Sequence, residues 1–328
     1  MRRAGLPARS DGYMSATLTA IDDLASTLLV SDYASTRPDL VALYERSKGR
    51  QWNASTDLAW DQLVAVDMPI IAEHRLSLYG TQAWERMSAA TRKRYNLLEA
   101  AWIVSQFLHA EQTSLVACGQ LMALLPDIDA KFYAASQGYD EARHAECYRR
   151  YLDEKLGVTY PIDANLKDLC SLALAGDEWP LKLISIQMIV ESLALGAFKT
   201  LVRSSVEPLL VSMLTYIMQD EARHVAFGRL ALERAIRESA PADRDRYEDF
   251  VATCTQVMYY GFFPTAVFEE LGLANVDALR AGVFASEQRR LFRADLFSVM
   301  IPGVRDVGLL TQRTKARYER LGIDVDRA

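Results

Sequence analysis

Apolar residues recur at intervals of three and four along most of the chain, which is the period of a helix buried on one side. The stretch LLEAAWIVSQFLHAEQTSLVACGQLMALL at 97–125 shows this pattern over its whole length. No segment alternates apolar and polar residues convincingly, so the chain is predicted to be all-α. The predicted helices cover residues 60–77, 80–91, 93–124, 127–155, 165–175, 179–203, 206–238, 243–272, 276–299 and 305–321.

Between residues 93 and 238, four predicted helices are about 25–33 residues long and are joined by short connections, the pattern of a helix bundle. Residues 1–50 are predicted to form an irregular or helical extension. Residues 51–328 contain no low-complexity tract and no break in composition, so they are predicted to form a single domain. Within that domain the bundle is expected at about 93–238, with further helices at 243–321.

Composition and charge restrict the class of protein. Half of the residues are apolar, enough for a sizeable core, and the net charge is −6 with no basic stripe, which argues against a nucleic-acid partner. No run approaches 18 uninterrupted apolar residues, so no membrane span is expected. The N-terminal MRRAGLPARSDGYMSATL lacks the apolar region of a signal peptide. The four cysteines form no close pair and indicate reduced thiols in a cytoplasmic protein.

The five residues Asp-Glu-Ala-Arg-His occur twice, at 140–144 and 220–224. In each copy the glutamate and the histidine are three positions apart, so on a helix they project from the same face. A carboxylate and an imidazole placed in this way can bind one metal ion. A single Glu-x-x-His is a weak signal, but two copies are much stronger.

Another glutamate stands 30 residues before the glutamate of each motif. Glu111 precedes Glu141, and Glu191 precedes Glu221, and both lie in very apolar helices. A glutamate on an apolar face is rarely buried without a partner. The whole set therefore recurs 80 positions later (111 to 191, 141 to 221, 144 to 224).

This set predicts a two-metal carboxylate site in a four-helix bundle, with one glutamate from each of two helices and one Glu-x-x-His from each of the others. Four carboxylates balance two divalent ions, and hard oxygen ligands with one imidazole per metal suit iron or manganese rather than zinc. Two iron ions are therefore expected, with a mixed Mn/Fe pair as the alternative. In the competing interpretation, the motif glutamates form surface salt bridges and the histidines are core residues. The predicted ligands are Glu111, Glu141, His144, Glu191, Glu221 and His224.

Charged neighbours of the motifs suggest a supporting shell around these ligands. Metal-bound histidines usually donate their second N–H to a carboxylate. Asp140 and Asp220 are predicted to accept it, each from the histidine of the opposite motif, and Arg143 and Arg223 to hold these aspartates. The alternative is that these residues form exposed pairs along their own helices.

With these motifs, roughly residues 50–240 resemble the ferritin-like di-iron carboxylate superfamily. The paired Asp-Glu-x-Arg-His is similar to the motifs of the bacterial multicomponent monooxygenases and of the acyl-carrier-protein desaturases. The resemblance implies a ferritin-like four-helix bundle with additional flanking helices. It also implies O2 activation at two irons, followed by oxidation of a C–H or N–H bond or of a nearby tyrosine.

Four positions depart from the patterns of particular families. Leu195 stands where the multicomponent monooxygenases have a threonine, and Ile217 stands where the p-aminobenzoate N-oxygenases have an additional histidine. The ligand-binding oxidases join a valine to a tyrosine, at positions that match Ser114 and Ile186 here. These two residues cannot form that link.

The chain also resembles ribonucleotide reductase small subunits. Their radical tyrosine lies four residues after the first motif's histidine, where Tyr148 stands, which makes it a candidate redox tyrosine. The stretch GRQWNASTDLAWDQL at 49–63 is similar to the segment that places a tryptophan near the irons, which implies a hydrogen-bonded chain Trp52–Asp220–His144. Only 50 residues separate the first motif's glutamate from the second buried glutamate, which is shorter than expected for such a subunit.

The predicted function is an O2-activating di-iron oxidase or oxygenase that hydroxylates, N-oxygenates or desaturates a small organic substrate. No flavin or nucleotide fingerprint is present, so a separate ferredoxin or reductase is expected to deliver electrons. A homodimer is expected. The alternatives are a radical-generating subunit similar to those of ribonucleotide reductase and an iron-storage ferroxidase.

A substrate pocket is predicted one helical turn from the two buried glutamates, on the face that they share. Its walls are mostly apolar and would exclude water. Gln187 and Ser114 are the polar exceptions and could orient a substrate. The alternative is that these side chains only pack helix against helix. The predicted pocket residues are Phe107, Ser114, Leu115, Gln187, Met188, Leu195 and Phe198.

Overall fold

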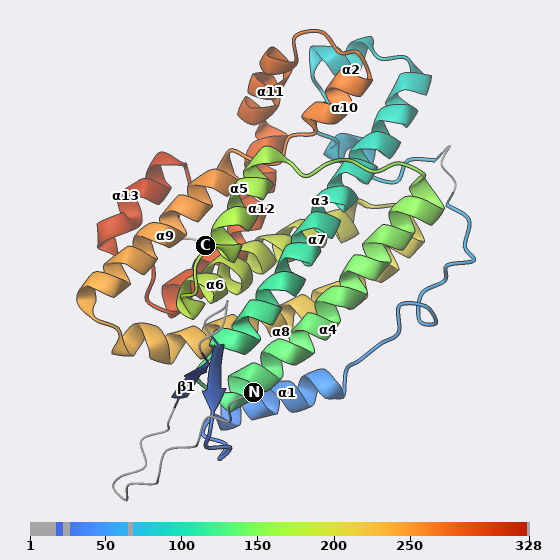
Figure 1. Ribbon diagram of the computed structural model, residues 1–328. Helices are drawn as coiled ribbons and strands as arrows, with labels where there is room; N and C mark the ends of the chain where they lie inside the picture. Colours follow the sequence, from blue (N-terminus) through green and yellow to red (C-terminus); the bar gives the residue numbers. More distant parts are fainter. Residues whose placement is uncertain (1–17, 22–26, 65–67, 327–328) are drawn as a thin grey trace, which may run out of the picture.

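The computed structural model describes residues 18–21, 27–64 and 68–326. The regular secondary structure of this part is helical apart from one small hairpin and an isolated bridge between Ile71 and Ser205, which confirms the all-α prediction. Four helices form the bundle, and α3 and α4 run side by side at its centre (Figure 1). They are α3 (Ala89–Leu124), α4 (Ile128–Arg150), α7 (Glu191–Ser204) and α8 (Pro208–Glu238).

Side chains cap the bundle helices at their first turns, where backbone N–H groups lack helical partners. Ser88 accepts a hydrogen bond from the third residue of α3, and Asp127 does the same for α4. At the start of α8, the buried Glu207 carboxylate accepts from the N–H groups of Leu209 and Leu210. These caps define where three of the four helices that carry the predicted ligands begin.

The fourth bundle helix continues a longer helical stretch. Helix α6 (Trp179–Leu183) runs through the π-helical segment η3 (Ile184–Val190) directly into α7. By length and composition alone, Trp179–Ser204 could cross a membrane, but 83% of its most apolar window is buried inside the fold. Its apolar residues therefore form the core of the bundle.

The remaining helices surround the bundle. Helix α12 packs along α7, and α9, α12 and α13 gather on one side, while α2, α10 and α11 gather at one end (Figure 1). These elements are α1 (Pro38–Lys48), η1 (Glu73–Arg75), α2 (Gln82–Arg86), η2 (Tyr151–Leu156), α5 (Ala164–Leu174), α9 (Pro241–Tyr259), α10 (Thr265–Glu270), α11 (Val276–Ala285), α12 (Glu287–Asp306) and α13 (Gln312–Arg320).

Two parts of the secondary-structure prediction were wrong. The antiparallel hairpin of β1 (Leu18–Ile21) and β2 (Thr27–Val30) was not expected, because four-residue strands are too short to show clear alternation. The helix predicted at 60–77 is absent from its described residues, which contain only the short η1. Pro69 lacks the N–H that a helix needs, and Asn96 binds the next two backbone N–H groups.

Two long predicted helices are each divided. The stretch 243–272 forms α9 and α10, separated at Gly261–Pro264, and the stretch 276–299 forms α11 and α12. Ser286 marks the second division, because its hydroxyl accepts from the N–H of Arg289 and caps α12. The periodic pattern of apolar residues continues across both breaks, so it does not reveal them.

Candidate metal centre

The six predicted ligand side chains meet between the four bundle helices, and each is at most 5% exposed. The three- and four-residue periodicity that buries one face of each helix also turns these polar side chains inward. They are Glu111 from α3, Glu141 and His144 from α4, Glu191 from α7, and Glu221 and His224 from α8.

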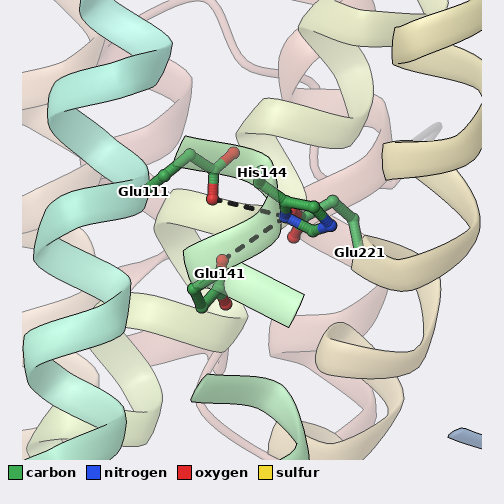
Figure 2. A group of neighbouring side chains, drawn as sticks. All are labelled: Glu111, Glu141, His144 and Glu221. Atoms are coloured by element: carbon green, nitrogen blue, oxygen red, sulfur yellow. Dashed lines mark ion pairs between the residues drawn. The ribbon is translucent and has the colours of Figure 1, made fainter. Parts of the chain in front are cut away.

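The first half of the cluster surrounds His144, as Figure 2 shows. Its Nδ1 lies 3.1 Å from Glu221 Oε1, and Glu141 Oε2 is 3.5 Å away. Glu111 Oε2 lies 3.6 Å from the same nitrogen. One imidazole nitrogen and three carboxylates therefore converge on one point.

The second half surrounds His224 in the same way. Its Nδ1 lies 3.3 Å from Glu141 Oε1 and 3.3 Å from Glu221 Oε2. Glu191 Oε2 is 3.8 Å away. Glu141 and Glu221 face both histidines, whose ring centroids are 5.9 Å apart. Two adjacent ligand groups with shared carboxylates could hold two metal ions.

Unsatisfied buried atoms test whether metal ions fit this cluster. His144 Nδ1, Glu141 Oε2 and Glu191 Oε2 are buried and accept or donate no hydrogen bond within the described residues. Buried polar atoms normally have partners. All three are potential ligand atoms and all point into the cluster, so the donor set fits two cations.

The charges of the cluster also indicate that it binds cations. Burial raises the pKa of Glu111 well above its usual range, and the charge of Glu221 adds to it. Burial, together with the charge of Glu141, raises the pKa of Glu191 in the same way. These carboxylates are therefore unfavourable as anions without added positive charge, which divalent cations would provide.

Each imidazole is held on its other side by an aspartate of the opposite motif, as the sequence predicted. His144 Nε2 lies 3.0 Å from Asp220 Oδ2, and His224 Nε2 lies 3.2 Å from Asp140 Oδ2. An N–H donated from Nε2 to the aspartate leaves Nδ1 with its lone pair toward the cluster. The paired motifs thus orient each other's rings.

The two predicted arginines both contact the aspartates. Arg143 donates to Asp140 Oδ1 at 2.6 Å and to Asp220 Oδ2 at 2.8 Å, so it joins the two motifs. Arg223 forms an ion pair with Asp220 and a longer one, of 3.8 Å, with Asp140. The alternative of exposed pairs is wrong for Asp140, Asp220 and Arg143, which are buried.

Trp52 lies against this network from the loop after α1. Its indole N–H donates to Asp220 Oδ2 at 2.7 Å, which completes the chain Trp52–Asp220–His144. The Arg143 guanidinium lies over the indole ring at 4.6 Å. The segment similar to that of the reductase subunits therefore places its tryptophan as that resemblance implied.

Two glutamines at the cluster were not predicted from the sequence. Gln137 Nε2 donates to Glu141 Oε1 at 2.9 Å and to Glu191 Oε1 at 2.7 Å. Gln51 donates to Asp140 and accepts from Arg143. Gln137 stands one turn before Glu141 on the same face, so its contact with the cluster could have been predicted from its position in the sequence. Nothing in the sequence around Gln51 does so.

Tyr148 lies one turn after His144 and is fully buried. Its hydroxyl has no hydrogen-bond partner among the described residues, and its ring packs 5.7 Å from Phe107. Burial raises the pKa of this phenol well above its usual range, and the charge of Glu111 adds to it. The side chain is therefore a neutral phenol beside the cluster.

A cavity of about 140 Å³ runs beside the cluster between α3, α7 and α12. Phe107 lines it, but the other six predicted pocket residues do not, because the cavity faces the neighbouring side of each helix. Ala110 and Val190 line it, and each directly precedes a predicted ligand. In η3 the wider π turn also shifts side chains from their α-helical positions. Gln187 does not line the cavity, and its side-chain amide donates to Gln137.

Comparisons with known proteins agree with this site. Residues 35–308 match the family of p-aminobenzoate N-oxygenase AurF. No curated protein sequence matches the chain. Among solved structures, two single-substitution variants of an R2-like ligand-binding oxidase with an anaerobically reconstituted Mn/Fe cofactor are similar in fold. One is 16% identical and the other 18%, each match covers 86% of this chain and 96% of that chain, and both TM-scores are 0.54.

Proposed function

The chain belongs to the p-aminobenzoate N-oxygenase family, and on this basis we propose that it binds two iron ions and uses O2 to oxygenate a nitrogen atom of a small organic substrate. The observation that carries the proposal is the buried cluster of four glutamates and two histidines, with ligand atoms that lack other partners. Hydroxylation and desaturation use the same kind of centre, and the family match favours N-oxygenation among the three.

The residues around the cluster would have distinct roles in this reaction. Glu111, Glu141, His144, Glu191, Glu221 and His224 would hold the metal ions, whose chemistry is the reduction and activation of O2. Asp140 and Asp220 fix the imidazole rings. Mn/Fe remains an alternative to Fe/Fe, because the ligand types suit both metals. The apolar side of the cavity would keep water from the reacting groups.

The expected histidine of this family is replaced here by Ile217, which is fully buried on α8. This member of the family therefore lacks the additional histidine at that position. We propose that the metal ions are held by the six residues of the cluster alone.

We also propose that a separate ferredoxin or reductase supplies electrons and that the protein is a cytoplasmic homodimer. The four free, buried cysteines support a reducing compartment. Light scattering after size-exclusion chromatography would measure the mass of the assembly directly.

Radical generation is a second candidate, favoured by the buried Tyr148 hydroxyl and by the Trp52–Asp220–His144 chain. If the protein generates a radical, the iron-loaded protein should show a tyrosyl radical signal in electron paramagnetic resonance after exposure to O2. That signal should disappear in Tyr148→Phe. An oxygenase without a stored radical would give no such signal in either protein.

Metal analysis tests the proposed function first. Anaerobic loading with ferrous iron should give two ions per chain in the wild type and fewer in Glu191→Ala, with Glu238→Ala on the exposed end of α8 as the unchanged control. A count of one or none in the wild type would contradict the di-iron site. Loaded protein with O2, a chemical reductant and p-aminobenzoate or related arylamines should then yield N-oxygenated products by mass spectrometry.

A further inference from the structure

Three roughly parallel rings lead from the metal cluster toward the protein surface. The Trp52 indole lies 6.4 Å from the ring of the predicted ligand His144, measured between centroids, with an angle of 20° between the planes. The Tyr216 ring lies 5.0 Å from the same indole, at 27°. Trp52 is only 8% exposed, whereas Tyr216 is half-buried, so the tyrosine is the ring of the three that meets water.

Hydrogen bonds join the same part of the molecule. The indole N–H donates to Asp220 Oδ2 at 2.7 Å, and that oxygen lies 3.0 Å from His144 Nε2. Tyr216 stands four residues before Asp220 on α8, so both side chains project from one face of the helix. Trp52 therefore contacts a ligand of the cluster through Asp220 and a partly exposed phenol through its ring.

The chemistry of these rings gives the path a direction. Indoles and phenols lose an electron more readily than most side chains, but they do not accept one under physiological conditions. The Asp220 carboxylate stabilises positive charge on the indole, whereas the Arg143 guanidinium, 4.6 Å from that ring, destabilises it. Positive charge on Trp52 should therefore pass on to Tyr216. The path suits electrons that move from the surface into an oxidised metal centre.

Tyr139 is a second tyrosine in this region and provides a comparison. It is 62% exposed, and the Arg143 guanidinium lies 5.3 Å from its ring. Its ring has no aromatic contact with Trp52 among the described residues. Loss of an electron next to a cation is unfavourable. Contact and charge therefore both favour Tyr216 over Tyr139 as the outer end of the path.

Such a path would protect oxidisable side chains around the cluster. The Tyr148 phenol is buried one turn after His144, and the thiols of Cys118 and Cys147 are buried on α3 and α4. Thiols are oxidised in successive steps, the later of which are irreversible. Electrons from a partly exposed phenol would reach the centre without damage to these buried groups.

We propose that Trp52 and Tyr216 form an escape path for oxidising equivalents, which supplies electrons to the metal centre when O2 has reacted there without substrate. This inference rests on the proposed function, because O2 at the metal centre is the oxidant. In each transfer one electron passes from Tyr216 through Trp52 to the centre, and the phenol releases its proton to water. The phenoxyl radical then takes one electron and one proton from a dissolved reductant, ascorbate or a thiol, which restores the phenol.

Spin trapping tests the path by a readout other than turnover. Reduced, iron-loaded protein is mixed with O2 and the nitrone trap DMPO in the absence of substrate, and the trapped residues are located by mass spectrometry of peptides. Wild type should carry the trap on Tyr216. Tyr216→Phe keeps the ring but should lose this adduct and accumulate several-fold more oxidised Trp52. Trp52→Phe should decrease the adduct on Tyr216 several-fold, although Tyr216 is still present.

Tyr139→Phe is the matched control, because it removes a more exposed phenol that lacks the ring contact with Trp52. It should give the same amounts of trapped Tyr216 and of oxidised Trp52 as wild type. Trap bound to Tyr139 as heavily as to Tyr216 in wild type would overturn the path. An adduct on Tyr216 that is unchanged in Trp52→Phe would do the same.

Pulse radiolysis of the metal-free protein separates this inference from the proposed function. Azide radicals oxidise indoles in preference to phenols, and transfer between them appears as loss of indolyl absorbance with growth of phenoxyl absorbance. The growth should be smaller in Tyr216→Phe than in wild type and Tyr139→Phe. Equal growth in all three would contradict the path even if the protein binds two irons. Smaller growth in Tyr216→Phe, in a protein that takes up no iron, would support the transfer step and contradict only the di-iron function.

Discussion

Each imidazole of the centre has two chemically different neighbours. On one side an aspartate accepts from Nε2, and on the other the glutamates approach Nδ1. Asp220 is the more heavily used aspartate, because Trp52, Arg143 and His144 all contact its carboxylate. At the scale of single residues, this side chain connects the N-terminal loop, α4 and α8.

Replacing Asp220 with alanine should therefore disturb the metal centre, although Asp220 is not itself a predicted ligand. The His144 ring would lose the group that fixes its orientation, and loss of such a partner typically lowers metal affinity about 10–100-fold. Competition with a coloured chelator would measure the affinity for ferrous iron. Asp153→Ala, which removes an exposed carboxylate, is the matched control, and equal affinities in the two variants would contradict this role.

The positions of the predicted ligands and of their aspartates could be inferred from the sequence because they follow a local rule. Residues three positions apart on a helix share a face, and a repeat of 80 positions showed that two such faces meet. Gln51 follows no local rule, since its partners at the cluster are distant in sequence and its environment arises only on folding. Six of the seven predicted pocket residues do not line the observed cavity for the same reason: helical spacing identifies a face but not the neighbour that covers it.

At the scale of elements, two glycines let helices approach closely. A Cβ added at Gly196 on α7 would lie 2.8 Å from Leu296 Cα on α12. A Cβ added at Gly228 on α8 would lie 2.4 Å from Gln187 Cβ in η3. Because the first contact is with backbone, no side-chain rearrangement can relieve it. Helix α7 carries Glu191, so this crossing helps to fix the position of a predicted ligand.

The opposite effects of two glycine substitutions test this packing. Gly196→Ala should lower the free energy of unfolding by about 1–3 kcal/mol, because it forces α7 and α12 apart. Gly282→Ala, on the exposed side of α11 with open space around it, should raise the free energy by about 0.5–1 kcal/mol through helix propensity. Urea unfolding of both variants gives these values, and destabilisation of similar size in both would contradict the close crossing.

The long helices were predictable from periodicity, whereas their interruptions were not. Apolar positions continue across Ser286, although that segment keeps an exposed face, and through η3, where every residue is buried by neighbours. The π turn before Glu191 needs one more residue per turn than an α-helix, and only the packing against α8 and α9 reveals it. Tertiary contacts therefore decide the details of elements whose existence the sequence already indicates.

At the scale of the whole molecule, the bundle encloses an excess of negative charge. Six carboxylates and two guanidiniums meet at the centre, which leaves four negative charges when all eight are ionised and both histidines are neutral, as metal ligands would be. Two divalent cations would cancel them. The residues concerned are Glu111, Glu141, Glu191, Glu221, Asp140, Asp220, Arg143 and Arg223.

The metal-free protein should consequently become more stable when one of these charges is removed. Burial makes the Glu191 anion unfavourable, as its raised pKa shows, whereas a glutamine can still accept the hydrogen bond from Gln137. After chelation, the unfolding temperature of Glu191→Gln should exceed that of wild type, by about 2–4 °C for each kcal/mol gained. Differential scanning calorimetry of the chelated proteins gives this comparison.

Iron should reverse the order of the two proteins. A ligand at 100 times its dissociation constant stabilises the folded state by about 2.7 kcal/mol, and the variant has lost a ligand carboxylate. The unfolding temperature of wild type should therefore rise more than that of Glu191→Gln when ferrous iron is added anaerobically. Glu238→Ala, far from the cluster, should follow wild type in both states. If wild type is already the more stable protein after chelation, the uncompensated charge does not strain the fold, and the cluster is not built around cations.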